Sequence, residues 1–265
     1  MTDLLHAALL GIIEGLTEFL PVSSTGHLLI AEHWLGARSE LFNVAIQAGA
    51  ILASLAVFRP RLQQLLLGLR VRDTRDYLAK LVLAFMITAV GGLIAKKMGL
   101  ELPQTVAPVA AALIIGGALM LLIEWVLADR AVISEVTWQV AFWVGSCQIL
   151  AAVFPGTSRS AATIFAAMLA GLTSRPAATE FAFLVGIPTM LAATAYEFLK
   201  LRGNTSATAP EDWPAFAVAF VVSAIVAFVA VKWLLRFVQT HRFTAFAWYR
   251  IAAGIALLAI VPILR

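Results

Sequence analysis

Apolar residues run along this chain in long blocks, and few polar positions separate them. A helix that crosses a membrane needs about 20 mostly apolar residues. The pattern therefore predicts an all-α integral membrane protein with six transmembrane helices. The six segments that meet the requirement are residues 41–58, 78–95, 106–127, 178–199, 214–235 and 246–264.

Two further apolar segments are interrupted by polar residues. Residues 3–35 break at Pro21, and residues 138–171 break at Pro155 and Gly156. Each half is about 12–17 residues long, which is too short to cross the bilayer. Irregular backbone at membrane depth is tolerated only where it is buried in protein or lines a wet cavity. We therefore expect two re-entrant helix–loop–helix hairpins, with the functional site at their turns.

The two interrupted segments also resemble each other. Residues 19–25, FLPVSST, align with residues 153–159, VFPGTSR, at an offset of 134 (153 minus 19). Each hairpin is followed by three spans, so the same order of elements occurs in residues 1–130 and 131–265. Three crossings reverse the direction of the chain, and inverted repeats of this kind hold sites near the bilayer midplane. We expect a single membrane domain built from two inverted repeats.

Composition supports membrane residence. Of the 265 residues, 62% are hydrophobic and 13% are charged, whereas soluble domains have roughly 45–50% and 25%. The formal net charge is +4, but basic residues in membrane proteins mostly report orientation, so no nucleic-acid partner is expected. The single cysteine, Cys147, excludes an intramolecular disulfide and is expected to pack as a small buried residue.

Lysine and arginine are divided unevenly between the two sides of this topology. Of the 19 such residues, twelve fall on one side, six fall on the other, and Arg159 lies within the second hairpin. The side richer in basic residues is taken as cytoplasmic, which places both termini outside. Residues 59–75 carry five of the twelve. They are expected either as an interfacial helix on the anionic leaflet or as an ordinary cytoplasmic loop.

Two carboxylates lie four residues apart in the first interrupted segment. Glu14 and Glu18 fall on one face of a helix, and no lysine or arginine lies one turn away to neutralise them. Paired carboxylates repel each other unless a cation or a shared proton joins them. Mg²⁺ and Ca²⁺ prefer oxygen ligands of this kind, so both residues are predicted to bind one of these cations. A capped or water-bridged pair near the interface is the alternative.

The run PVSSTGH, residues 21–27, follows the two carboxylates. Ser23, Ser24 and Thr25 precede an apolar helix, and free N–H groups at a helix start attract anions. His27 lies three residues after Ser24, and a hydroxyl beside an imidazole is the minimum for an activated nucleophile. Alternatively, the hydroxyls only satisfy backbone groups at the break, and His27 is a packed polar residue.

The second break, PGTSRS, residues 155–160, carries a permanent cation. Arg159 at a helix start can hold phosphate, and at membrane depth it requires an anion, either a glutamate of the first hairpin or the ligand. Gly156 permits close backbone approach. Three neighbouring hydroxyl groups offer further donors: Thr157, Ser158 and Ser160. Gln47 and Glu180, at nearly aligned positions of the first and fourth spans, are expected to line the same cavity.

Together, the two motifs and the six-span layout resemble the bacterial undecaprenyl pyrophosphate phosphatases, also called the bacitracin-resistance protein family. The family's Glu-x-x-x-Glu and Pro-Val-Ser-Ser-Thr-Gly-His run stands at residues 14–27, and its Pro-Gly-x-Ser-Arg-Ser-x-x-Thr stands at residues 155–163. The resemblance covers nearly the whole chain. One departure is Ala161, where many members have glycine.

The resemblance implies removal of the terminal phosphate from undecaprenyl pyrophosphate, which recycles the lipid carrier for cell-wall synthesis and gives bacitracin resistance. Glu14 and Glu18 would bind the divalent cation or position water, and Arg159 would hold the pyrophosphate. The residues implied to assist Arg159 are Ser23, Thr25 and Ser158. Ser24, His27 and an activated water are the candidate nucleophiles, with His27 also a candidate acid/base. We favour Ser24 assisted by His27.

The resemblance also implies the bacterial cytoplasmic membrane, an active site open to its outer face, and a homodimer. A transporter or flippase for a phosphate-bearing lipid is the main alternative, because inverted repeats with broken helices are common in transporters. Reversible binding would not require a Glu-x-x-x-Glu pair beside Ser-x-x-His, so an enzyme is favoured.

Overall fold

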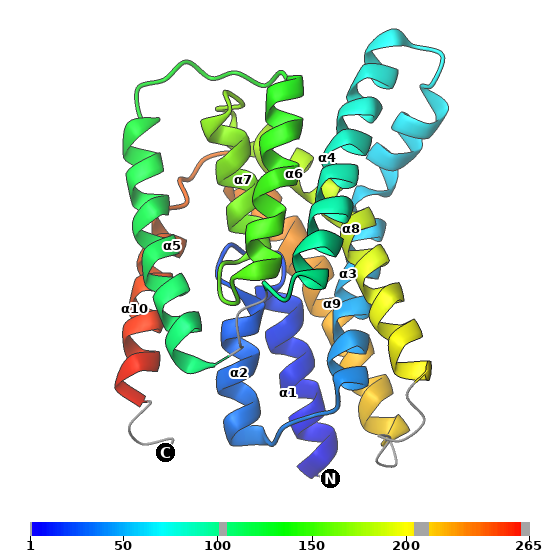
Figure 1. Ribbon diagram of the computed structural model, residues 1–265, viewed down its shortest axis with the longest axis vertical. Coiled ribbons are helices and arrows are strands. Elements are labelled where there is room, and N and C mark those ends of the chain that lie inside the picture. The colour runs from blue at the N-terminus through cyan, green and yellow to red at the C-terminus, as the bar shows by residue number, and fades with distance from the viewer. Residues whose placement is uncertain (1, 101–104, 204–211, 261–265) are drawn as a thin grey trace.

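The computed structural model describes residues 2–100, 105–203 and 212–260, and these residues form ten α-helices and no strand (Figure 1). The all-α prediction is therefore confirmed. In chain order the helices are α1 (Thr2–Thr17), α2 (Ser24–Leu35), α3 (Glu40–Leu67), α4 (Arg72–Lys97), α5 (Val106–Val126), α6 (Trp138–Val153), α7 (Arg159–Leu169), α8 (Arg175–Gly203), α9 (Trp213–Phe237) and α10 (Thr244–Ile260).

Five of the described helices are long and apolar enough to cross a membrane, namely α3, α4, α5, α8 and α9. The chain is thus a multi-pass membrane protein. The predicted sixth span, residues 246–264, begins within α10. The described part of α10 has 17 residues, and residues 261–264 of that span lie outside the described ranges.

Both predicted helix breaks are confirmed. α1 ends at Thr17 and α2 begins at Ser24, while α6 ends at Val153 and α7 begins at Arg159. Figure 1 shows the α1–α2 hairpin and the α6–α7 hairpin entering from opposite ends of the molecule, with their turns near its middle. Residues that are far apart in the sequence are thereby brought to one place.

The second helix of each hairpin is preceded by a serine cap with unusual backbone angles, Ser23 before α2 and Ser158 before α7. Ser23 has φ 74° and Ser158 has φ 59°, and their side chains accept hydrogen bonds from the backbone N–H groups of Gly26 and Ala161. A non-glycine residue in this region costs about 1–3 kcal/mol and is typical of functional sites. The caps also show that Ser23 corresponds to Ser158, so the 134-residue offset becomes 135 after the break.

Close packing of small residues holds the hairpins against the long helices. α1 packs along α9, and α6 packs along α4. A Cβ atom on Gly11 would lie 2.5 Å from the carbonyl oxygen of Ala219, and one on Gly145 would lie 2.6 Å from that of Ala84. Helices in lipid associate through such backbone contact, because lipid tails remove the hydrophobic driving force between them.

The basic stretch at residues 59–75 differs from both predicted forms. α3 continues through Pro60 to Leu67, and only residues 68–71 separate it from α4. The stretch is therefore the tip of a helical hairpin, neither a separate interfacial helix nor an ordinary loop. Proline removes one helical hydrogen bond, and the leucine- and glutamine-rich sequence that follows it favours helix strongly enough to continue.

Candidate active site

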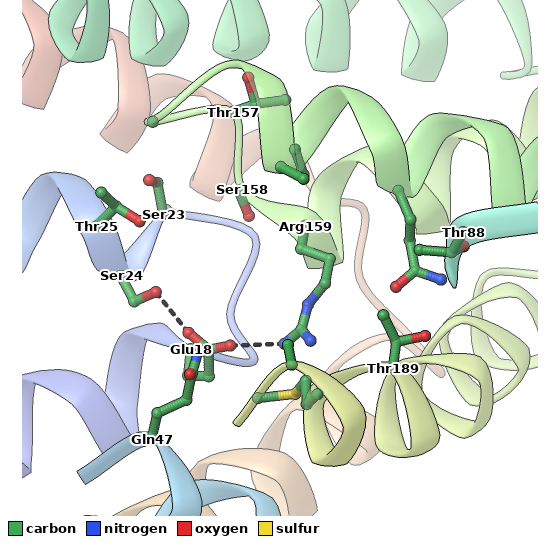
Figure 2. Close-up of a pocket in the computed structure, with 16 residues that line it drawn as sticks. Glu18, Ser23, Ser24, Thr25, Gln47, Thr88, Thr157, Ser158, Arg159 and Thr189 are labelled. Carbon is green, nitrogen blue, oxygen red and sulfur yellow. Dashed lines mark hydrogen bonds and ion pairs between the residues drawn. The ribbon is translucent and has the colours of Figure 1, made fainter. Parts of the chain in front are cut away.

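A cavity of about 230 Å³ lies where the two hairpin turns face α3, α4 and α8 (Figure 2). Nine of the residues singled out in the sequence line it: Glu18, Ser23, Ser24, Thr25, Gln47, Gly156, Thr157, Ser158 and Arg159. They come from both halves of the chain, as the two motifs predict. The cavity is therefore the candidate active site.

Glu18 connects the two hairpins across this cavity. Its Oε1 atom accepts a hydrogen bond from Nη2 of Arg159 at 2.6 Å, and its Oε2 atom accepts one from Oγ of Ser24 at 2.5 Å. Figure 2 shows both contacts as dashed lines. Charge-assisted hydrogen bonds are typically short and strong. Of the two anions expected for Arg159, the structure supplies the glutamate.

Glu14 lies one helical turn before Glu18 and just outside the cavity lining. Its side chain is buried, and its Oε2 atom has no hydrogen-bond partner among the described residues. Its electrostatic neighbours are Glu18 and Arg159. A buried carboxylate oxygen left without a partner is costly. It indicates that a proton, a water or a cation completes this position.

A divalent cation needs oxygen ligands, and Glu14 and Glu18 are the carboxylates available beside the cavity. Within the described ranges, no group of three or more His, Cys, Asp or Glu side chains could hold a metal ion. Mg²⁺ is often bound by only one or two carboxylates, with water and substrate phosphates completing the shell. Glu14, with its unpartnered oxygen, and Glu18 fit that smaller requirement.

His27 does not lie where the sequence suggested. It is absent from the cavity lining, its Nδ1 atom lies 2.7 Å from the carbonyl oxygen of Ser23, and its Nε2 atom lies 2.6 Å from the hydroxyl of Tyr249. The Ser24 hydroxyl donates to Glu18 instead. The structure therefore gives Ser24 a carboxylate partner in place of the predicted imidazole.

Ser160 and Glu180 also lie away from this cavity. The Ser160 hydroxyl donates to the carbonyl oxygen of Leu20 at 3.0 Å and so ties α7 to the first turn. Glu180 accepts a hydrogen bond from Nε of Arg61 at 2.8 Å and does not line the cavity, which corrects the expectation drawn from its alignment with Gln47. α8 presents residues more than two turns later to the cavity.

Sequence reasoning missed several residues that line the cavity. Three are polar: Thr88, Gln148 and Thr189. Four are apolar: Ala151, Ala152, Met190 and Ala193. Gln148 could have been found, because it follows Glu14 by the same 134 residues that relate the two breaks (148 minus 14). The others lie in apolar helices where the sequence offers no distinguishing signal.

Arg250 was also missed, and it supports both turns. It is fully buried, although the charge count above included it among the twelve basic residues of the cytoplasmic side, and that assignment is wrong. Its guanidinium donates to backbone carbonyl groups of both hairpin turns and of α5. The accepting oxygens belong to Pro21 (3.4 Å), Gly156 (3.2 Å), Thr157 (3.2 Å), Ala112 (3.0 Å) and Leu113 (3.5 Å). The available signal was an arginine within the apolar run FAWYRIAAGIALL.

Comparison with known proteins agrees with these residues. Residues 7–256 match the family described as "Bacitracin resistance protein BacA". Proteins named undecaprenyl-diphosphatase are close relatives. One from Rhizobium etli strain CIAT 652 is 61% identical over 97% of this chain and 96% of its own length. One from Stenotrophomonas maltophilia strain K279a is 61% identical over 99% of both chains. The chain therefore belongs to the bacitracin resistance protein BacA family.

Proposed function

We propose that this chain removes the terminal phosphate of undecaprenyl pyrophosphate, with Ser24, Glu18 and Arg159 as the central groups. Family membership and relatives named undecaprenyl-diphosphatase support the activity. The products are undecaprenyl phosphate and inorganic phosphate, so the enzyme recycles the lipid carrier for cell-wall synthesis and gives bacitracin resistance. The observation that supports the assignment of residues is the continuous contact from Ser24 through Glu18 to Arg159.

Substrate binding follows from the charges in the cavity. The terminal phosphate replaces Glu18 as the partner of Arg159, because a guanidinium binds phosphate and carboxylate through the same planar donors. The starts of α2 and α7 add the positive ends of two helices. The site lies among helices that cross the bilayer, so a lipid headgroup can enter while its chain stays in hydrocarbon.

The proposed reaction has two steps. Oγ of Ser24 attacks the terminal phosphorus while its proton passes to Glu18, and the bond from that phosphorus to the bridging oxygen breaks. Undecaprenyl phosphate leaves and a phosphoserine is formed. A water then attacks the phosphorus, the bond to Oγ breaks, and Glu18 returns the proton to Ser24. The water oxygen and both of its hydrogens leave with the phosphoryl group as dihydrogen phosphate. Arg159 compensates the charge on the transferring group, which is the main requirement of phosphoryl transfer.

We propose that Glu14 and Glu18 also hold a divalent cation, Mg²⁺ or Ca²⁺. When bound, such an ion would neutralise phosphate charge. The unpartnered, buried oxygen of Glu14 supports this role. Without the ion, a proton or a water would complete the same oxygen.

We also propose that residues 1–130 and 131–265 are inverted repeats with six spans and two re-entrant hairpins. The order of short and long helices in α1–α5 recurs in α6–α10. The close contact of Gly11 with Ala219 recurs as that of Gly145 with Ala84. The charge count, without Arg250, still favours both termini outside. That the cavity opens to the outer face of the bacterial cytoplasmic membrane is what the family resemblance implies, and it stays a prediction. A homodimer stays a prediction, and cross-linking in membranes tests it.

Phosphate release from undecaprenyl pyrophosphate by the purified, detergent-solubilised protein tests the function. Arg159→Ala should lower the rate by about 10²–10³-fold, the usual loss when a donor to a developing charge is removed. Arg130→Ala, at an exposed position, is the matched control and should keep full activity. A chelator should abolish wild-type release. A wild type that releases no phosphate would instead support a transporter or flippase.

Trapping of labelled phosphate on the protein tests the nucleophile. The two-step reaction predicts an acid-stable phosphoserine that Ser24→Ala abolishes. An acid-labile adduct that depends on His27 would identify the imidazole as the nucleophile. A wild-type enzyme that turns over without any adduct would identify an activated water.

A further inference from the structure

Gln148 on α6 lines the catalytic cavity with an unpaired amide. The residue is 3% exposed, and its Oε1 and Nε2 atoms have no hydrogen-bond partner among the described residues. Buried amides in native proteins nearly always have partners, because an unpaired one loses the hydrogen bonds it made to water. No described residue pairs with this amide, so a ligand or a water must supply its hydrogen-bond partner.

The neighbouring hydroxyl groups cannot donate to a ligand in this part of the cavity. The Thr88 hydroxyl donates to the carbonyl oxygens of Ala84 and Gly145, each at 2.9 Å. The Thr189 hydroxyl donates to the carbonyl oxygen of Val185, also at 2.9 Å. Both threonines thus present only lone pairs. The NH₂ group of Gln148 is the donor that an anion would meet beside them.

The internal repeat gives an independent reason to assign a ligand to this position. Gln148 follows Gly145 by three residues, as Glu14 follows Gly11, and each glycine makes the corresponding close contact with a long helix. Glu14 and Gln148 thus approach the site from opposite hairpins. A carboxylate at one position suits a cation, whereas a neutral amide at the other accepts an anion that a carboxylate would repel.

The surroundings identify which anion fits. Alanine and methionine side chains line the same cavity: Ala151, Ala152, Met190 and Ala193. The terminal phosphate carries more charge and is matched by Arg159. The inner phosphate, which is esterified to the isoprenoid chain, carries less charge and lies next to apolar groups. A neutral donor with an apolar wall matches this second group.

We propose that the amide of Gln148 donates to the inner, ester-linked phosphate of the lipid pyrophosphate, and that the apolar wall receives the first isoprene unit. The inference rests on the proposed function and adds a specificity element to it. Negative charge develops on the inner phosphate as the bridging bond breaks. Gln148 therefore contributes more to the transition state than to the bound substrate.

Gln148→Leu tests this assignment, with Gln139→Leu as the matched control on the exposed face of the same helix. The Gln148→Leu enzyme is not expected to unfold, because the substitution removes two unpaired polar atoms at nearly constant volume, and its melting temperature should be unchanged or higher. We expect kcat/KM for a prenyl pyrophosphate to fall by about tenfold or more. Product inhibition by farnesyl monophosphate should weaken similarly. Inhibition by inorganic phosphate, which needs only Arg159, should change less than about twofold.

Wild-type phosphate release is the positive control, and without it the proposed function itself fails. With an active wild type, a normal kcat/KM in Gln148→Leu would overturn the assignment. It would show that the amide bonds only water and not the substrate. Equal weakening of inhibition by inorganic phosphate and by farnesyl monophosphate would place Gln148 at the terminal phosphate and contradict the proposal. A melting temperature that falls together with activity would show a structural role.

Discussion

Ser24 donates its hydroxyl hydrogen to Glu18, with Oγ 2.5 Å from Oε2. This contact places a proton acceptor on the hydroxyl that faces the cavity. Glu18→Gln keeps the size of the side chain but removes its basicity. We expect kcat to fall by about 10²–10⁴-fold, the usual contribution of a general base. Steady-state phosphate release measures the effect.

Glu135→Gln is the control for this change, because Glu135 is exposed in the α5–α6 connection. It should leave kcat within about twofold, as surface substitutions usually have small effects. Near-wild-type turnover in Glu18→Gln would show that another group accepts the proton. Activity that returns to Glu18→Gln when the cation concentration is raised would assign Glu18 mainly to metal binding.

Tyr249 fixes the orientation of His27, which in turn bonds the carbonyl oxygen of Ser23. Tyr249→Phe removes one hydroxyl and one hydrogen bond, so kcat/KM should fall by about 2–10-fold. The double variant with His27→Gln should be no worse than His27→Gln alone, because both act through the same turn. Tyr196→Phe is the control. Additive losses would show that His27 acts independently of Tyr249, as a nucleophile or acid would.

Some of this site could be predicted because its signals are local. Prolines at residues 21 and 155 interrupt apolar segments, so the turns follow from chain chemistry alone. The requirement that Arg159 have an anion follows from its depth in the membrane. The identity of that anion does not, because it depends on how two hairpins 141 residues apart pack together.

Other features depend on helix rotation and tertiary contact, which sequence does not show. Each residue of a helix turns the side chain by about 100°, so the weak alignment of Gln47 with Glu180 did not fix which face of α8 meets the cavity. Arg250 has only backbone partners, and carbonyl groups carry no sequence signature. His27 was assigned to Ser24 by spacing, but Tyr249, more than 200 residues later, binds its free nitrogen.

Contact between α6 and α4 depends on Gly145. A Cβ atom there would lie 2.6 Å from the carbonyl oxygen of Ala84, so Gly145→Ala should destabilise the protein by about 1–3 kcal/mol, as overpacking does. Gly92→Ala is the matched control on α4, because no heavy atom lies within 4 Å of its Cβ position. It should be neutral or stabilising. Unfolding in detergent measures the stability of the two variants. Equal stability of Gly145→Ala and Gly92→Ala would contradict this packing.

Arg250 joins the two hairpin turns through backbone carbonyl groups alone, and Arg250→Lys tests this support. An ammonium group on a flexible chain cannot reach Pro21, Thr157 and Ala112 together, as the planar guanidinium does. Carbonyl groups left unpaired in the interior are costly. We expect a loss of about 3–5 kcal/mol, similar to breaking a buried ionic contact, measured as a lower melting temperature in detergent.

Arg242→Lys makes the same chemical change at an exposed position and should melt like the wild type. Arg159→Lys separates support from catalysis, because we propose that Arg159 binds the substrate phosphate, whereas Arg250 bonds only backbone carbonyl groups of the turns and of α5. Arg159→Lys should therefore lose activity by about 10²-fold, while its melting temperature stays near that of the wild type. Arg250→Lys should show both a lower activity and a lower melting temperature. An Arg250→Lys protein that melts normally but is inactive would place the second arginine in direct contact with substrate.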